Sequence, residues 1–149
     1  MIHGVQVFPL KRWDDARGWL VEVYRHDQTD FIPAMGYMSF TKEGVARGPH
    51  EHLYQTDWFG FLWGTFKLYL WDNRPESPTH GERQVFEVGE RNPTAVLIPP
   101  RVVHAYKCVS PGGGLVVNLP DKLYAGLNKK QPVDEIRHED VRGSKFSLE

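Results

Sequence analysis

Two histidines, His50 and His52, stand two residues apart in a stretch, Gly44–Gly64, that reads GVARGPHEHLYQTDWFGFLWG. Residues i and i+2 of an extended strand point to the same face, so both imidazoles would project into one space. Near neutral pH an imidazole can act as a general base or bind a metal. The pair therefore indicates proton transfer or metal binding, and the spacing leaves both open.

Two more residues could complete such a site from distant parts of the chain. His104 follows the Pro-Pro break in IPPRVVHAYKC, where one predicted strand ends and another begins. In a β-barrel, two such strands can bring distant residues together at one mouth. Tyr124, in LPDKLYAG, lies in a loop-like stretch and could donate a proton across a cavity, although covering the barrel edge is the alternative.

Arg17 and Arg47 each stand directly before a glycine, in the runs ARG and ARGP. The small neighbours let a guanidinium reach a ligand, and arginine is the usual bidentate partner of phosphate. The alternative is a surface charge or a salt bridge to Glu22 or Glu43. The two arginines are therefore candidates for binding an anionic ligand.

The elements that must position these residues are strands, because helical patterning is scarce and short β-rich runs recur between Gly, Pro, Asn and Asp. We predict strands at Val5–Phe8, Trp19–Tyr24, Tyr37–Thr41, Gly44–Arg47, Trp58–Trp63, Thr65–Trp71, Gln84–Val88, Ala95–Ile98, Val103–Cys108 and Leu115–Leu119. Ten short strands at this spacing are typical of an all-β sandwich or barrel, and a β-jelly roll fits the length best. In the charged tail we expect a short helical turn around Val133–His138 that packs against the barrel.

Length and composition bound the class of protein. The chain has 149 residues, which predicts one domain over 1–149, and its formal net charge of −1 argues against nucleic-acid binding. No apolar run approaches the length of a membrane span, and the N-terminus does not resemble a signal peptide. The single cysteine, Cys108, fits a reducing compartment. We expect a cytoplasmic protein with no membrane partner.

Five runs in register resemble one family, the dTDP-4-dehydrorhamnose 3,5-epimerases and related nucleotide-sugar epimerases of the cupin superfamily. These runs are DARGWLVEVYR, VARGPHEH, DNRPESPTHGE, IPPRVVHAY and NLPDKLYAG. The resemblance implies a cupin-type jelly-roll homodimer that binds a dTDP-linked 4-keto-6-deoxyhexose and needs no cofactor. The reaction it implies is proton abstraction beside the C4 ketone, at C3 or C5 or both, followed by reprotonation from the opposite face.

The resemblance also assigns roles to residues. His50 matches the catalytic base, Tyr124 the opposing acid, and His104 a second histidine near the substrate. Arg17 and Arg47 match the residues that hold the diphosphate, and Glu22 matches an acid near the nucleotide; the segment carrying the first arginine often crosses to the partner subunit in the family. His52 and Asp57 are expected to complete the substrate site.

This chain departs from the family's pattern in several places, including residue 57, the Pro49-His50-Glu51 run, the register around Tyr124 and the C-terminal segment. Asp57 stands where the family usually carries a lysine, and the longer C-terminal segment, with the acid that orients the base, has no clear counterpart. Asp134 or Asp140 could supply that acid. A single epimerisation, or a related sugar-ketone isomerisation, fits this pattern as well as the double one.

The same stretch also resembles the general metal-cupin motif. Its spacing is matched by Gly44, His50, His52, Asp57 and Gly64, with His104 in the place of the last histidine. Such a set suits Zn, Mn, Fe or Ni, and a metal would polarise the ketone as a Lewis acid. A third alternative is a non-catalytic module that binds sugar nucleotides. The runs SPTHGE and DARG favour the metal-free epimerase, because generic metal cupins do not need them.

Overall fold

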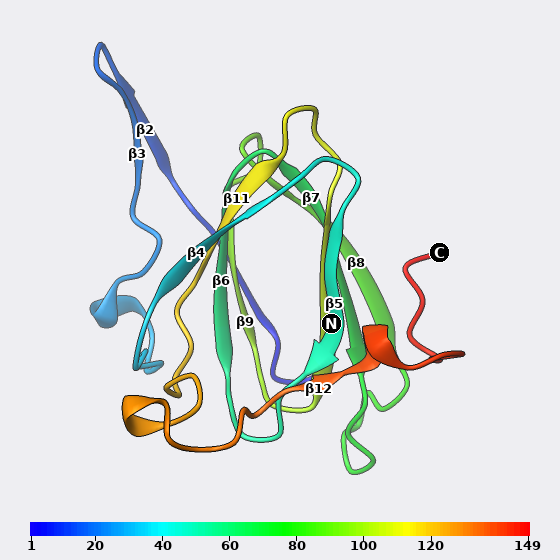
Figure 1. The fold of residues 1–149 in the computed structure, drawn as a ribbon. Helices are drawn as coiled ribbons and strands as arrows, with labels where there is room; N and C mark the ends of the chain where they lie inside the picture. Colours follow the sequence, from blue (N-terminus) through cyan, green and yellow to red (C-terminus); the bar gives the residue numbers. More distant parts are fainter.

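A computed structural model describes residues 1–149. Two five-stranded antiparallel sheets face each other, and a two-stranded hairpin projects from one end (Figure 1). The first sheet has the order β1 (Gln6–Pro9), β9 (Thr94–Ile98), β6 (Asp57–Trp63), β11 (Gly114–Asn118), β4 (Tyr37–Thr41). The second has the order β12 (Ile136–Arg137), β5 (Ala46–Glu51), β10 (Val102–Cys108), β7 (Thr65–Asp72), β8 (Arg83–Gly89). The hairpin is β2 (Arg12–Asp15) and β3 (Gly18–Val21).

All ten predicted strands are present, and β4 has the predicted bounds. The all-β jelly roll is therefore confirmed, with two facing sheets that are not hydrogen-bonded into a closed barrel. Two strands were not predicted, β2 and β12. The helical elements are three short 3₁₀ turns: η1 (His26–Gln28), η2 (Leu127–Lys129) and η3 (His138–Asp140). None of them is long and apolar enough to cross a bilayer.

The core lies between the two sheets. β6 and β9 carry almost continuous apolar runs and are buried along nearly their whole length. Phe59, Phe61 and Phe66 fill the centre with Tyr106, and each of these rings lies within about 6 Å of another. Cys108 is buried in the same cluster and is unpaired. The lower end of the space between the sheets is left for polar side chains.

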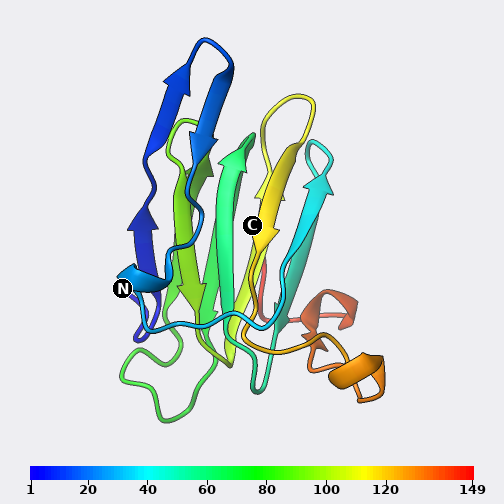
Figure 2. The ribbon, with the colours of Figure 1, turned by 90° about the vertical axis from the view of Figure 1, so that its left-hand side faces the viewer.

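The tail closes that lower end and then covers the outside of the second sheet (Figures 1 and 2). The helical turn expected around Val133–His138 is wrong in position, because residues 136–137 pair with β5 as strand β12 and the turn η3 follows them. Further along, Phe146 packs on Trp71 and becomes buried. The tail does pack against the barrel, as expected.

Candidate active site

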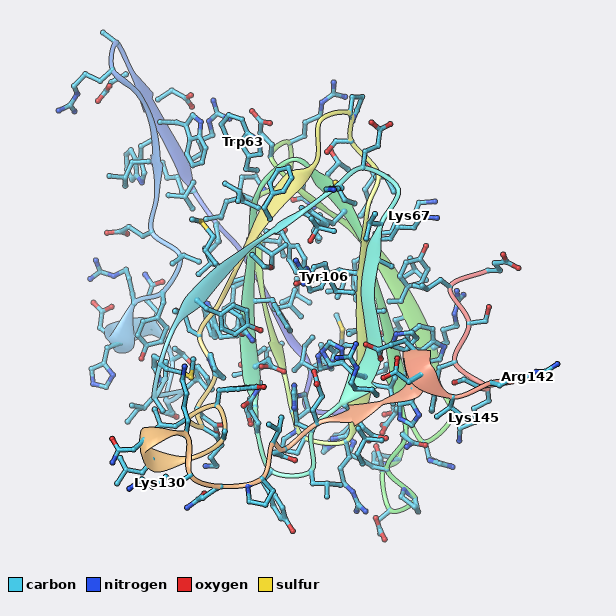
Figure 3. All side chains as sticks on the ribbon, in the orientation of Figure 1. Trp63, Lys67, Tyr106, Lys130, Arg142 and Lys145 are labelled. Carbon is cyan, nitrogen blue, oxygen red and sulfur yellow. The ribbon has the colours of Figure 1, made fainter.

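A cavity of about 1050 Å³ opens between the sheets at the end that the tail covers. Its walls come from β4, β5, the loop 120–126 and the segment 131–139 that leads into and includes β12. Figure 3 shows Tyr106 in the space between the sheets, and its side chain forms part of the cavity wall. The volume suits a ligand at the upper end of the small-molecule range.

β5 and β10 bring His50 and His104 together. The two residues are direct partners in the antiparallel register, and their rings are 4.5 Å apart between centroids. The close approach depends on Gly48, which has φ +84°, and a Cβ there would lie 2.5 Å from the carbonyl oxygen of His104. His104 is buried behind His50, and its Nδ1 faces the carbonyl of Val102. The strand register therefore brings these two histidines together, as the sequence suggested.

His52 lies beside them, and both of its ring nitrogens face acceptors. Nδ1 contacts the backbone carbonyl oxygen of Asp134, and Nε2 lies 3.2 Å from a carboxylate oxygen of Asp57. A carbonyl and a carboxylate can only accept, so this arrangement favours a ring protonated on both nitrogens. Burial alone would lower the pKa of His52, but the bond and charge of Asp57 raise it to about 9.

Asp57 is buried behind His52 rather than at the cavity surface. Its Oδ1 accepts amide N–H groups from Gln55 and Asn118, both at 2.8 Å, while its Oδ2 faces His52 and lies 3.6 Å from His104 Nε2. Burial would raise the pKa of Asp57, but these partners, His52 first, lower it to about 2. The group is a fixed carboxylate that orients its neighbours.

His50 presents a neutral imidazole to the cavity. Burial, followed by the charges of His104 and His52, lowers its pKa to about 2. A neutral ring has a lone pair with which to take a proton. The carboxylate of Glu139 lies 3.9 Å from His50 Nδ1, so an imidazolium formed there would face a negative charge.

The acid beside His50 is thus Glu139, whereas the sequence suggested Asp134 or Asp140. The Asp134 carboxylate instead accepts the backbone amides of residues 53, 54 and 55 at 2.7 to 3.0 Å. Asp140 pairs with Arg137 at 3.1 Å. No spacing rule could have found Glu139, because its position depends on β12 pairing with β5 and on the 2.8 Å contact between His138 and Glu51.

Of the other predicted site residues, Arg47 and Tyr124 also line the cavity. Arg47 donates to the Thr41 hydroxyl at 3.0 Å and to a backbone carbonyl of β4, which fixes its side chain across the cavity wall. Tyr124 lies in the loop 120–126 and is 57% exposed. It stands at the edge of the cavity rather than in its depth.

Arg17 and Glu22 lie outside the cavity. Arg17 is at the tip of the projecting hairpin, 90% of its side chain is exposed, and it pairs with Asp15 at 2.5 Å. Glu22 follows β3 and pairs with Arg25 at 3.2 Å. One chain by itself does not bring these two residues to the histidines.

Two residues that the sequence did not single out belong to the site. Tyr37, on β4, lines the cavity, and its hydroxyl accepts a hydrogen bond from Asn118 at 3.1 Å. Asn118, on β11, is buried, and the same amide nitrogen reaches Asp57. Asn118 could have been found from the sequence, because it is a single amide in the apolar run LVVNL and the alternation of the strand directs it toward the core.

The metal alternative can be tested on the same geometry. His50, His52 and His104 each offer a nitrogen, and these atoms lie within 4.8 Å of one another. His52, however, has both nitrogens directed at acceptors, and a ring in that state offers no lone pair to a metal. In this arrangement His52 has no free nitrogen with which to complete a three-histidine metal site. Metal binding would require His52 to give up its contact with Asp57 or with Asp134.

The fold and the cavity define an all-β jelly-roll protein with a ligand-sized cavity between its two sheets. Among solved structures, the chain is similar to a dTDP sugar isomerase from Desulfovibrio desulfuricans, with TM-score 0.87 and 23% identity over 98% of this chain and 91% of that one. It is also similar to ChmJ, a 3'-monoepimerase from Streptomyces bikiniensis solved with dTDP-quinovose, with TM-score 0.79 and 22% identity over 91% of this chain and 70% of that one.

The sequence then identifies the family. The profile of the dTDP-4-dehydrorhamnose 3,5-epimerases matches residues 1–140. The chain is 39% identical to the probable low-salt glycan biosynthesis epimerase Agl13 of Haloferax volcanii over 126 residues, 83% of this chain and 81% of that protein. It is 38% identical to the spore coat polysaccharide biosynthesis protein SpsL of Bacillus subtilis over 109 residues, 72% of each. The chain belongs to the dTDP-4-dehydrorhamnose 3,5-epimerase family, whose members are isomerases, and the resemblance seen in the sequence is confirmed.

Proposed function

We propose that the protein epimerises a dTDP-linked 4-keto-6-deoxyhexose at one or both carbons beside the C4 ketone. The observation that carries the proposal is the imidazole of His50, which lies on the wall of the cavity with a carboxylate oxygen of Glu139 3.9 Å from its Nδ1. A base of this kind must be unprotonated before the reaction and stabilised once it is protonated. Burial keeps the ring unprotonated before the reaction, and the nearby Glu139 carboxylate reduces the cost of charging it during proton abstraction.

The reaction runs in two proton transfers. His50 takes the hydrogen of a carbon beside the ketone, and the electron pair of that C–H bond moves into the carbonyl to give an enolate. Tyr124 then donates its hydroxyl proton to the other face of the same carbon, and the enolate returns to the ketone. The phenolate regains a proton from water and His50 loses its own, so the cycle needs no external oxidant or reductant.

The nucleotide end of the substrate is proposed to lie toward Arg47 at the open side of the cavity. Arg17 and Glu22 would complete that end only if the hairpin of a second copy reached over the cavity, so we propose a homodimer. The projecting hairpin and the exposed side chains of Trp13 and Leu20 on it support this assembly. We also place the protein in the cytoplasm, where the unpaired, buried Cys108 would stay reduced.

Solvent deuterium tests the reaction. The protein is incubated in D₂O with dTDP-4-keto-6-deoxyglucose, and NMR follows the label and the inverted product. We expect wild-type protein to exchange and invert, His50→Ala to do neither, and Tyr124→Phe to exchange without inverting. Absence of exchange in wild-type protein that binds dTDP would refute the epimerase and leave a binding module.

Mixed protomers test the assembly. His50→Ala and Arg17→Ala proteins are each expected to be inactive and, once mixed and re-equilibrated, to regain activity, because a heterodimer holds one site with both residues. Analytical ultracentrifugation gives the oligomeric state independently. A monomer, or mixtures that stay inactive, would contradict the proposal that the hairpin acts in trans. Fractionation of cells tests the location.

A further inference from the structure

We propose that Tyr37 is a catalytic residue that donates a hydrogen bond from its phenol to the ketone oxygen of the substrate as that oxygen becomes an enolate. The inference rests on the proposed epimerisation and deepens it. Proton abstraction beside a ketone needs a positive or hydrogen-bond-donating group at the developing oxyanion. In this chain the position at which the family usually has a lysine holds Asp57, whose buried carboxylate cannot donate.

The direction of the Tyr37 proton follows from its neighbours. A carboxylate can only accept, so the atom of Asn118 that lies 2.8 Å from Asp57 Oδ1 must be its amide nitrogen. That nitrogen has a second hydrogen, which points at the hydroxyl oxygen of Tyr37 over 3.1 Å. The Tyr37 oxygen therefore accepts from Asn118, and its own proton must point elsewhere. The residue lines the cavity, so the open direction is toward a ligand.

Strand pairing holds this contact in place. Tyr37 and Asn118 are direct partners in the register of β4 and β11, and Asn118 is buried with its amide fixed by Asp57. A donor that is already oriented loses little entropy or reorganisation energy when the oxyanion forms. Tyr37 is therefore positioned through two consecutive hydrogen bonds from a fixed carboxylate.

Tyr37 and His50 face the same cavity from opposite sheets. His50 comes from β5 in the second sheet and Tyr37 from β4 in the first. A sugar ring held between the sheets would present a carbon to one wall and its carbonyl oxygen to the other. Another phenol of the cavity wall, Tyr106, is buried and already pairs with the Ser39 hydroxyl at 3.1 Å, so it is less free to bind a ligand than Tyr37, which is 45% exposed.

The acidity of Tyr37 suits a donor that keeps its proton. Burial raises its pKa to about 12, against the lowering effect of the bond from Asn118. The phenol is thus neutral and protonated throughout the range in which a sugar nucleotide is stable. It can donate a hydrogen bond in every turnover without being recharged from solvent, whereas Tyr124 has to give up its proton and recover it.

Tyr37→Phe tests the assignment, because the change removes one hydroxyl and keeps the ring. We expect solvent deuterium exchange and inversion to fall together by roughly 10²- to 10³-fold in kcat, the usual effect of losing one oxyanion donor. Binding of dTDP and the far-ultraviolet circular dichroism spectrum should match wild type. Tyr69→Phe is the control, because Tyr69 lies on β7 in a separate cluster outside the cavity and no hydrogen bond involves its hydroxyl.

Each outcome decides the matter. A joint fall of exchange and inversion with intact dTDP binding supports the proposal. Exchange retained with inversion lost would make Tyr37 the opposing acid and overturn it, and so would full activity. A loss of dTDP binding would reveal a binding or folding role and also overturn it. If wild-type protein neither exchanges nor inverts, the epimerisation itself fails, which is distinguishable because the comparison with Tyr37→Phe then has no activity to start from.

Discussion

Replacing Glu139 with glutamine would remove the charge beside His50 and leave the side chain's size unchanged. The carboxylate lies 3.9 Å from Nδ1 of the base. Two unit charges at that distance interact by about 4 kcal/mol at an effective dielectric constant of 20. The Glu139 side chain is 23% exposed, and Arg137 contacts the same carboxylate at 3.2 Å, so both water and a cation reduce the effect. About 1–2 kcal/mol then remains for the imidazolium form of His50.

The expected result of Glu139→Gln is a fall in kcat of roughly 5- to 30-fold, since about 1.4 kcal/mol corresponds to a factor of ten in rate. The effect should be on kcat, with KM nearly unchanged, because Glu139 stabilises the charge formed during proton abstraction and acts through His50. The assay is the rate of deuterium incorporation and of inversion by NMR under saturating substrate. Asp140→Asn is the matched control, because Asp140 is exposed and contacts only Arg137.

Two results would refute this reasoning. One is a Glu139→Gln protein whose kcat equals that of wild type. The other is a protein whose loss of activity lies entirely in KM, because Glu139 would then help to bind substrate rather than to stabilise the protonated base. Thermal unfolding of both variants shows whether the segment still folds onto β5.

Three further predictions concern stability and metal. Asp134→Ala removes an acceptor of three backbone amides and should lower the free energy of unfolding by about 2–4 kcal/mol, against less than about 0.5 kcal/mol for Asp140→Ala, as measured by urea unfolding. Asp72→Asn should lower the free energy of unfolding by about 2–4 kcal/mol at pH 7, because it removes the acceptor of bonds from Arg74 and two hydroxyls. Burial would raise the pKa of Asp72, but these bonds lower it. Since that folded pKa is depressed, the contribution is present above the unfolded pKa of about 3.9 and is lost at lower pH, so variant and wild type should converge in acid. Treatment with a chelator should leave deuterium exchange unchanged; stoichiometric metal in untagged protein, absent from His50→Ala, would contradict the metal-free site.

The strands could be predicted from the sequence because their signals are local. Apolar alternation and turn residues gave all ten main strands, and the i, i+2 spacing gave the shared face of His50 and His52. β2 carries no such signal, because its sequence RWDD is largely charged and its pairing is confined to the hairpin. β12 has two residues, Ile136 and Arg137, and exists only because the edge of β5 is free to pair with it.

The contacts between distant strands could not be predicted in the same way. That His104 faces His50 depends on the register of β10 against β5, which includes a bulge between residues 104 and 106. That Glu139, and not Asp134, lies beside His50 depends on the pairing of β12 with β5. The family resemblance could supply the roles of residues with a counterpart, but it offered no counterpart for the acid that residues 128–149 place beside His50.

Asp57, which replaces the lysine usual in the family, is part of a set of residues that depend on one another. The Asn118 and Gln55 amides donate to its carboxylate, and the ring of His52 faces it at 3.2 Å. An ammonium group at residue 57 would face these donors and leave them all without an acceptor, which is costly in a buried site. The aspartate therefore belongs together with His52 and Asn118, and through Asn118 with Tyr37. In place of a lysine that would put a positive charge beside the ketone, this site has the buried acceptor Asp57. Through Asn118, Asp57 orients the neutral phenol of Tyr37, the proposed hydrogen-bond donor.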